Sequence, residues 1–273
     1  MFKERTSGGE GCPIEFSGIV ITYNEARRLR ECLNSLAFCE QLLVVDLGSK
    51  DGSLEIVREC GAELIEHAWV PIVEQVWPYA VSLARHEWVL LLDPDEVLPA
   101  GIEDDFRRVI TENPDLGAMR VPWQFFFKGR ALHCTVWGQR NTKMVVQHKA
   151  RVEFSAGVHR GRKVLPGYRV VELPGRDADY CGKHYWVDSY RELFEKHMRY
   201  IKLEGESRYN AGQRFSWFKA ILSTGHALEI NLIDNRGLLG GFNGIFLSLF
   251  YTWYVWMGWL SLRQYGRRQN TQA

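Results

Sequence analysis

Three acidic side chains, Asp93, Asp95 and Glu96, follow an apolar run in the segment VLLLDPDEVLP. The run from Trp88 to Leu92 has the composition of a buried strand, so the carboxylates would lie at a strand end. Two carboxylates on alternate residues can face one hard cation, and Mg²⁺ or Mn²⁺ prefers oxygen ligands shared with substrate phosphates. A phosphoryl-accepting aspartate, or merely the acidic start of a helix, would explain the same residues.

Two earlier strand ends carry polar residues as well. The apolar run SGIVIT is followed by Tyr23, Asn24 and Glu25, and the run QLLVVD by the loop LGSKDGS. In a parallel sheet the carboxyl ends of the strands share one edge, where ligands collect. We therefore expect these residues and the three acids to lie on one rim of a sheet.

The elements that would position this rim alternate along the first 115 residues. Apolar strands are expected at 17–22, 41–46, 62–67 and 88–93, and Leu29, Cys32, Leu33 and Leu36 have helical spacing between the first two. A helix interrupted near Pro78 is expected before the fourth strand. This alternation predicts an α/β fold with a mostly parallel sheet covered by helices on both faces. From 116 to 186 the pattern is irregular and aromatic, as in an α+β extension.

The C-terminal region has a different composition. A helix with one apolar face is expected over 187–208, and no charged residue occurs in 237–262. That stretch could span a bilayer, but its glycines and clustered aromatic residues are unusual for a simple span. A membrane-interface or re-entrant segment, a true span, and a buried or oligomerising helix pair all stay open. The following Arg263, Arg267 and Arg268 suit an anionic cytoplasmic lipid surface.

Composition and missing motifs exclude other classes. The chain has 34 Lys plus Arg against 33 Asp plus Glu, so no global field would attract nucleic acid. The six cysteines form no CxxC pair and are expected to be reduced thiols. The N-terminus has no apolar core of a signal peptide, so we expect the body of the protein not to be exported. The phosphate-loop, dinucleotide-binding, HExxH and GxSxG motifs do not occur.

Three segments resemble, in order and spacing, the nucleotide-sugar-binding half of inverting family 2 glycosyltransferases: IVITYNEARRLRECLNSL, LLVVDLGSKDGSLEIVRECGAELIEH and ARHEWVLLLDPDEVLP. The resemblance continues through WGQRNTKMVV, GVHRG and KHYWVDSYRELFEKHMRYIKLEGESRY, and is nearest to the lipopolysaccharide core β-glucosyltransferase branch. It implies a GT-A-like fold over residues 15–186, with the nucleotide-sugar half at about 15–115 and the acceptor half at about 116–186. A C-terminal helical region, 187–273, would then associate with a membrane through 237–262.

The resemblance also implies roles for particular residues. Asp93 and Asp95 would form the DxD pair that holds Mg²⁺ or Mn²⁺, with Glu96 contributing beside them. The residues implied to border the nucleotide sugar are Thr22, Tyr23, Asn24, Glu25, Asp46, Gly48, Ser49 and Asp51. Lys143 stands where relatives often carry an arginine, and His184 where a late histidine could help close the site.

This chain departs from the family pattern where the acceptor should be activated. An inverting transfer needs a base to take the proton from the acceptor hydroxyl. Relatives often show His-Glu in the acceptor half, but this chain has His159 followed by Arg160. The base therefore stays open among Glu153, His159, Asp177 and Asp179. With Arg162, Arg160 could instead bind an anionic acceptor, such as a lipid phosphate.

The sequence thus predicts a metal-dependent inverting glycosyltransferase that uses a UDP-sugar. Its acceptor would be a lipid-linked or cell-envelope glycan, and it would work at the cytoplasmic face of a bacterial inner membrane. A homo-oligomer through the C-terminal region is compatible with this hypothesis, and no nucleic-acid partner is expected. The alternatives are a membrane-associated binding or scaffold protein that keeps the fold without turnover, and a phosphatase of the haloacid dehalogenase type with Asp93 as nucleophile.

Overall fold

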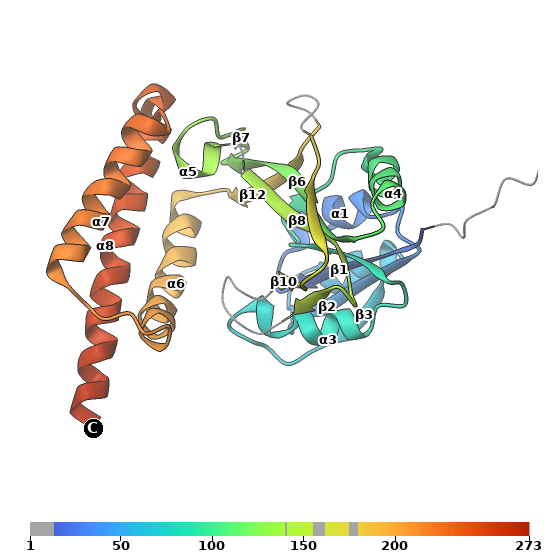
Figure 1. Cartoon of the computed structure of the whole chain (residues 1–273), viewed down its shortest axis with the longest axis horizontal. Coiled ribbons are helices and arrows are strands. Elements are labelled where there is room, and N and C mark those ends of the chain that lie inside the picture. Colours follow the sequence, from blue (N-terminus) through green and yellow to red (C-terminus); the bar gives the residue numbers. More distant parts are fainter. Residues whose placement is uncertain (1–13, 140, 155–161, 175–179, 273) are drawn as a thin grey trace, which may run out of the picture. The chain divides into compact units, whose positions relative to one another are not determined.

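The computed structural model describes residues 14–139, 141–154, 162–174 and 180–272. Over these ranges the chain forms two compact units (Figure 1). Unit 1 consists of residues up to Pro94, Leu98–Arg120 and Met144–Leu173, and unit 2 of Asp95–Val97, Val121–Lys143 and the residues from Pro174 onward. The boundaries fall inside two strands, so those strands contribute residues to both units. The domain limits expected from the sequence stay a prediction.

Unit 1 is built on a parallel sheet that matches the expected strands. Its strand order is β3-β2-β1-β4-β8, and the first four strands are parallel while β8 is antiparallel to β4. The bounds are β1 Phe16–Thr22, β2 Gln41–Asp46, β3 Glu63–Glu66, β4 Trp88–Leu92 and β8 Asn141–His148. β1 and β4 are buried along their whole length, which explains their continuous apolar sequence. The expected parallel sheet is therefore confirmed.

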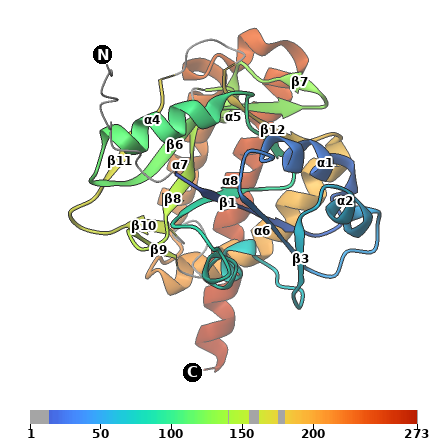
Figure 2. The same ribbon diagram turned by 90° about the vertical axis from the view of Figure 1, so that its right-hand side faces the viewer.

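Helices of unit 1 follow the predicted spacing. The bounds are α1 Ala26–Ser35, α2 Ser53–Glu59, η1 Val73–Gln75, α3 Trp77–Ser82 and α4 Ile102–Glu112. α1 and α2 lie side by side (Figure 2), and α1 buries Leu29, Cys32 and Leu33 as its periodicity predicts. Pro78 lies in the first turn of α3, where its missing N–H costs nothing, and the interruption precedes it.

The rest of unit 1 is a set of short strands. β9 Val152–Phe154 and β10 Arg162–Val164 form a separate antiparallel pair. β11 Arg169–Glu172 is parallel to the beginning of β6, which spans Leu116–Phe127. The part of unit 1 that follows residue 116 is thus built of strands.

Unit 2 contains a smaller group of strands. The bounds are β5 Glu96–Val97, β7 Arg130–Ala131, β12 Gly182–Val187 and the short helix α5 Thr135–Gly138. β12 is parallel to the second half of β6 and antiparallel to β5, while β7 closes a hairpin with the end of β6. Phe127, Trp186, Leu193 and Phe250 belong to the apolar core of this unit.

The C-terminal part of unit 2 is helical. The bounds are α6 Tyr190–Asn210, α7 Trp217–Glu229, η2 Ile230–Asp234, η3 Gly237–Gly240 and α8 Gly241–Gln272. Ser189 and Ser216 cap α6 and α7 with side-chain oxygens that accept backbone N–H bonds. The uncharged stretch 237–262 becomes η3 and most of α8. In the described residues, 237–270 is the one helical segment long and apolar enough to cross a membrane, with a mean hydropathy of 1.3.

We expect Gly182→Ala to destabilise the protein. Gly182 pairs with Trp123 across β12 and β6, and a Cβ atom at this glycine would overlap the indole ring. The strand and the ring must shift to accommodate it, which should cost about 1–3 kcal/mol. A fall in the midpoint of urea unfolding would report this loss.

Gly225→Ala is the matched control, because a Cβ atom at Gly225 in α7 meets no other atom within 4 Å. Alanine is the better helix former, so this variant should be unchanged or more stable by up to about 1 kcal/mol. Equal midpoints for Gly182→Ala and the parent chain would contradict the packing described for β12.

Candidate active site

The loops after β1 and β2 hold each other through reciprocal hydrogen bonds. The backbone N–H of Asn24 donates to Ser49 Oγ at 2.8 Å, and the N–H of Lys50 donates to Asn24 Oδ1 at 2.7 Å. Asp46 Oδ2 accepts from the N–H groups of Gly48 and Ser49, both at 2.9 Å. Asn24 and Gly48 adopt positive φ angles of 57° and 90°, which asparagine and glycine tolerate best. The loop geometry itself therefore accounts for Asn24 in TYNEA and for Asp46, Gly48 and Ser49 in DLGSKDGS.

Asp51 fastens the same loops to the starts of α1 and α2. Its Oδ2 accepts from Ala26 N–H at 3.0 Å, and its Oδ1 accepts from the N–H of Ser53, also at 3.0 Å, and from the Ser53 hydroxyl. Burial alone would raise the pKa of Asp51, but hydrogen bonds from Ser53 and Ala26 outweigh it and lower that pKa. This carboxylate is thus held ionised by the protein, in a positioning role.

Two buried oxygen atoms at these strand ends have no hydrogen-bond partner among the described residues. They are Thr22 Oγ1 and Asp46 Oδ1, and the two residues are aligned in the β1–β2 register. Buried polar groups are nearly always satisfied in native proteins. Next to them Tyr23 is exposed at the rim. The carboxyl ends of β1 and β2 therefore retain hydrogen-bonding capacity that a ligand could use.

The acidic segment is divided between the two units. Asp93 belongs to unit 1, where its carbonyl oxygen accepts from the Cys32 thiol of α1 at 3.4 Å. Asp95 and Glu96 belong to unit 2, where β5 pairs with β12 and aligns Glu96 with His184. The Tyr185 N–H donates to the Asp95 carbonyl at 2.9 Å and extends this pairing.

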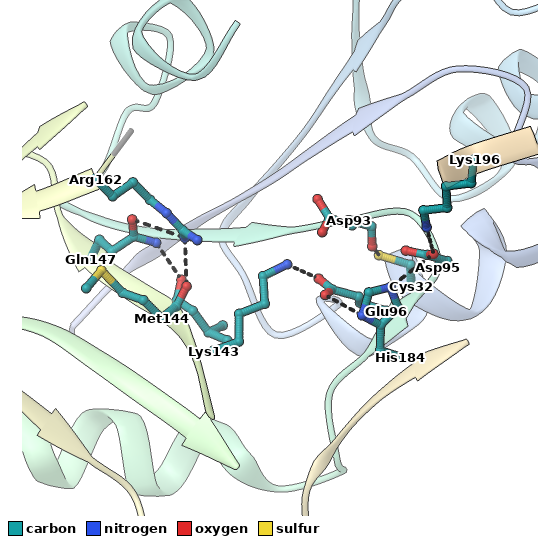
Figure 3. Close-up of polar contacts among 11 residues, drawn as sticks. Cys32, Asp93, Asp95, Glu96, Lys143, Met144, Gln147, Arg162, His184 and Lys196 are labelled. Atoms are coloured by element: carbon teal, nitrogen blue, oxygen red, sulfur yellow. Dashed lines mark hydrogen bonds and ion pairs between the residues drawn. The ribbon is translucent and has the colours of Figure 1, made fainter. Parts of the chain in front are cut away.

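This strand pairing gathers what we call the cation–carboxylate cluster: Asp95, Glu96, Lys143, His184 and Lys196 (Figure 3). Glu96 is only 1% exposed, and its Oε2 accepts from Lys143 Nζ. His184 lies between the two acids, with Nε2 3.2 Å from Asp95 Oδ2 and Nδ1 3.5 Å from Glu96 Oε1. Lys196 Nζ is 3.9 Å from Asp95 Oδ2.

The cation–carboxylate cluster carries more positive than negative charge when His184 is protonated. Burial opposes the imidazolium form of His184, but the carboxylates of Asp95 and Glu96 outweigh it and raise the pKa of His184. The ring packs on Phe125, with centroids 4.7 Å apart. When His184 is protonated, three cations face two carboxylates, an arrangement that can take up a further anion such as a phosphate.

Four residues expected from the sequence therefore meet in this cluster, and a fifth was missed. Asp95, Glu96, Lys143 and His184 were expected site residues, whereas Lys196 was not. Lys196 lies in α6, whose sequence pattern indicates only an amphipathic helix, and its Nζ also donates to the Trp186 carbonyl at 3.3 Å. No strand-end position or motif marks this lysine in the sequence.

The expected acceptor and base residues have mixed outcomes. The Arg162 guanidinium donates to the Met144 carbonyl at 2.7 Å (Figure 3). It also stacks on the Trp77 ring, so it is engaged within unit 1. Glu153 is exposed on β9, opposite Lys163. The remaining candidates, His159, Arg160, Asp177 and Asp179, lie outside the described residues. Their roles stay predictions.

A divalent cation fits the chemistry of the acids, although the chain supplies few ligands. The described residues contain no group of three or more His, Cys, Asp or Glu side chains placed to hold a metal. Asp93 and Asp95 offer hard carboxylate oxygens separated by one residue. Magnesium-type sites are commonly held by one or two carboxylates, with substrate phosphates and water supplying the other ligands. The residues present suit a cation that arrives with a diphosphate.

The sheet and its flanking helices form a GT-A-like fold. Residues 17–122 match the family model described as Glycosyl transferase family 2. An uncharacterized glycosyltransferase of Rickettsia felis is 31% identical over 100 residues, which cover 36% of this chain and 35% of that protein. The lipopolysaccharide core biosynthesis glycosyltransferase LpsC of Rhizobium meliloti is 22% identical over 219 residues, 77% of each chain. The predicted resemblance to family 2 glycosyltransferases is confirmed over residues 17–122, the segment that the family model matches.

A solved structure supports the fold independently. The mannosyltransferase PcManGT of Pyrobaculum calidifontis, in complex with GDP-Man and Mn²⁺, superposes with a TM-score of 0.54 and 16% identity. The similarity covers 93% of this chain and 88% of that one. The expected GT-A-like α/β fold class is confirmed.

We expect Glu96→Ala to lower the free energy of unfolding by about 3 kcal/mol, because it leaves Lys143 and His184 without their buried carboxylate. Urea unfolding monitored by circular dichroism would measure the loss. The double variant Glu96→Gln with Lys143→Met removes both charges and should recover most of the stability. An unfolding midpoint for Glu96→Ala equal to that of the parent chain would contradict this pairing.

Proposed function

We propose that this protein is an inverting, metal-dependent glycosyltransferase that moves a sugar from a UDP-sugar to a lipid-linked or cell-envelope glycan. The observation that carries the proposal is the cation–carboxylate cluster beside the DxD pair in a family 2 domain. Such a cluster has the charges needed to receive a diphosphate and to stabilise it as a leaving group.

The residues divide the work between nucleotide and diphosphate. Thr22, Asp46 and the loops locked by Asn24, Ser49 and Asp51 border the base and ribose, a role supported by the unsatisfied oxygens of Thr22 and Asp46. Tyr23, Glu25 and Gly48 complete this border. A nucleotide that hydrogen-bonds to these groups would compensate their burial.

The diphosphate is received by the acidic segment and its cations. The resemblance implies that Asp93 and Asp95, on alternate residues of the chain, form the DxD pair that would hold Mg²⁺ or Mn²⁺. When bound, this ion offsets the charge that develops on the departing diphosphate. Lys143, His184 and Lys196 orient the carboxylates and add positive charge, while buried Glu96 positions Lys143 and His184.

The roles proposed for residues that bind and activate the acceptor come from the resemblance to the family. Transfer with inversion requires a base, for which Glu153 and His159 stay candidates. Arg160, and Arg162 if it leaves its present partners, would bind an anionic group of the acceptor. A membrane-linked acceptor agrees with the named relative in lipopolysaccharide core biosynthesis and with the apolar C-terminal helix. The protein would then act at the cytoplasmic face of a bacterial inner membrane.

A binding or scaffold protein without turnover is the second candidate. The departure at Arg160, where relatives often carry glutamate, favours it. The retained DxD pair and the cations around Asp95 oppose it, because a protein that no longer transfers sugar has no need of a charged leaving-group site. Release of nucleoside diphosphate from a nucleotide sugar separates the two.

We expect Asp95→Asn to lower metal-dependent release of UDP from a UDP-sugar by about 10²–10³-fold, as is typical when one electrostatic contact to a leaving group is lost. The amide preserves the shape of the side chain, so the thermal midpoint without ligand should change little. Asp104→Asn, on the exposed surface of α4, is the matched control and should retain full release. Undiminished release by Asp95→Asn would contradict the metal assignment.

A thermal-shift screen of nucleoside diphosphates tests the donor without needing the acceptor. We expect UDP with Mn²⁺ to raise the unfolding temperature most, since a ligand at 100 times its dissociation constant stabilises the folded state by about 2.7 kcal/mol. UDP with a chelator should give a much smaller shift. A larger shift with GDP or ADP would identify another nucleotide, and none with any nucleotide would favour the scaffold candidate.

A further inference from the structure

Unit 2 exposes a series of large apolar side chains on α7 and on the segment that leads into α8. We call them the exposed apolar set: Trp217, Phe218, Ile221, Leu222, Ile233, Leu238, Leu239, Phe242, Ile245 and Leu249. Single exposed apolar residues are ordinary on protein surfaces. A concentration of them on neighbouring elements is typical of a surface that contacts a partner or a membrane.

The helix α7 exposes large apolar side chains on its outer face, whereas an ordinary surface helix exposes polar ones. It packs on α8 through Ala220, which lies in a buried cluster with Trp259 and Leu262, and through Trp217, whose ring contacts Trp256. Phe218, Ile221 and Leu222 recur at helical spacing and are 75%, 63% and 62% exposed. A surface helix normally turns its apolar stripe toward the core. The stripe of α7 is therefore available to something outside the protein.

The segment that begins α8 repeats this arrangement. Leu247 and Phe250 face the core of unit 2, whereas Leu239 is 82% and Phe242 is 74% exposed. Figure 1 shows η3 and the start of α8 at the end of the α7–α8 hairpin, where α7 and α8 are connected. The exposed apolar set thus belongs to one helical hairpin.

The body of α8 is unsuited to crossing a bilayer because α6 packs along it. Contacts run from Tyr190 with Phe246, through His197 with Tyr254, to Tyr209 with Tyr265. The charged residues of α6 are Arg191, Glu192, Glu195, Lys196, Arg199, Lys202, Glu204, Glu206 and Arg208. A spanning α8 would draw these charges into hydrocarbon, where each is costly. The α6–α8 pair therefore does not cross the hydrocarbon core.

The charge of the hairpin identifies the surface that it meets. From residue 214 to the end of α8 the basic residues are Arg214, Lys219, Arg236, Arg263, Arg267 and Arg268. The acidic residues in the same range are Glu229 and Asp234. Apolar side chains bordered by basic residues suit an anionic lipid surface. A symmetric contact between two copies would bring together two surfaces that both carry a net positive charge, which is unfavourable.

We propose that α7, η3 and the start of α8 lie in the plane of an anionic bilayer surface, with the exposed apolar set inserted below the headgroups and no segment crossing the membrane. This inference does not depend on the transfer reaction. Vesicle binding measures lipid contact alone, whereas UDP release without a lipid acceptor measures the proposed function, so failure of one is distinguishable from failure of the other.

Flotation of the full-length protein with vesicles of phosphatidylglycerol and phosphatidylethanolamine tests the surface. We expect the double variant Phe218→Glu with Leu222→Glu to lose at least tenfold in the bound-to-free ratio. Met198→Glu, an equally drastic change at an exposed residue of α6, should stay within twofold of the parent. Vesicles of phosphatidylcholine alone should bind the parent severalfold more weakly. Unchanged flotation of the double variant, in a chain shown by circular dichroism to be folded, would overturn the proposal.

Two further measurements distinguish the in-plane hairpin from a transmembrane span and from a dimer interface. With an epitope after Ala273 and inside-out inner-membrane vesicles, external protease should remove the epitope if the hairpin lies in the plane. Protection of the epitope would show a span and overturn the proposal without any substitution. Light scattering should give the same mass for the parent and the double variant. A dimer that dissociates in the variant while flotation is unchanged would assign the surface to a second copy.

Discussion

The two-residue strand β5 is the structural constraint on which the candidate site depends. It begins at Glu96, the last of the three acids, and its antiparallel pairing with β12 aligns Glu96 with His184. The same pairing is extended by the hydrogen bond from Tyr185 to the Asp95 carbonyl. Because the backbone is fixed in this way, two carboxylates are held against a histidine from a distant part of the chain. Without β5 the segment would be an ordinary exposed turn after a buried strand.

Charge compensation then decides what the site can bind. A nearly fully buried Glu96 is stable only because Lys143 and His184 face it, and His184 also brings positive charge to the side of Asp95. Lys196 adds a further cation from α6. The cluster therefore combines carboxylates that suit a hard cation with positively charged side chains that suit a phosphate. This combination supports the proposal that the site receives a departing diphosphate and that the locked loops after β1 and β2 border the nucleotide.

The sequence predicted much of this arrangement because its signals were local. Apolar strands such as QLLVVD and helical spacing such as Leu29, Cys32 and Leu33 arise from short-range periodicity, and the structure confirms both. The position of β12 beside β5 could not be predicted, since register between distant strands leaves no periodic signature. For the same reason Lys196 was missed. The reversed polarity of α7 was also missed, because its apolar residues have the same spacing whether they face a core or a membrane.

We propose above all that Asp93 and Asp95 bring a divalent cation to the diphosphate of a nucleotide donor. Anomalous diffraction from crystals of the full-length protein with UDP and Mn²⁺ would test this role best. We expect one manganese peak within coordination distance of an Asp95 carboxylate oxygen and of the diphosphate. Bound UDP with no manganese beside Asp93 or Asp95 would contradict it.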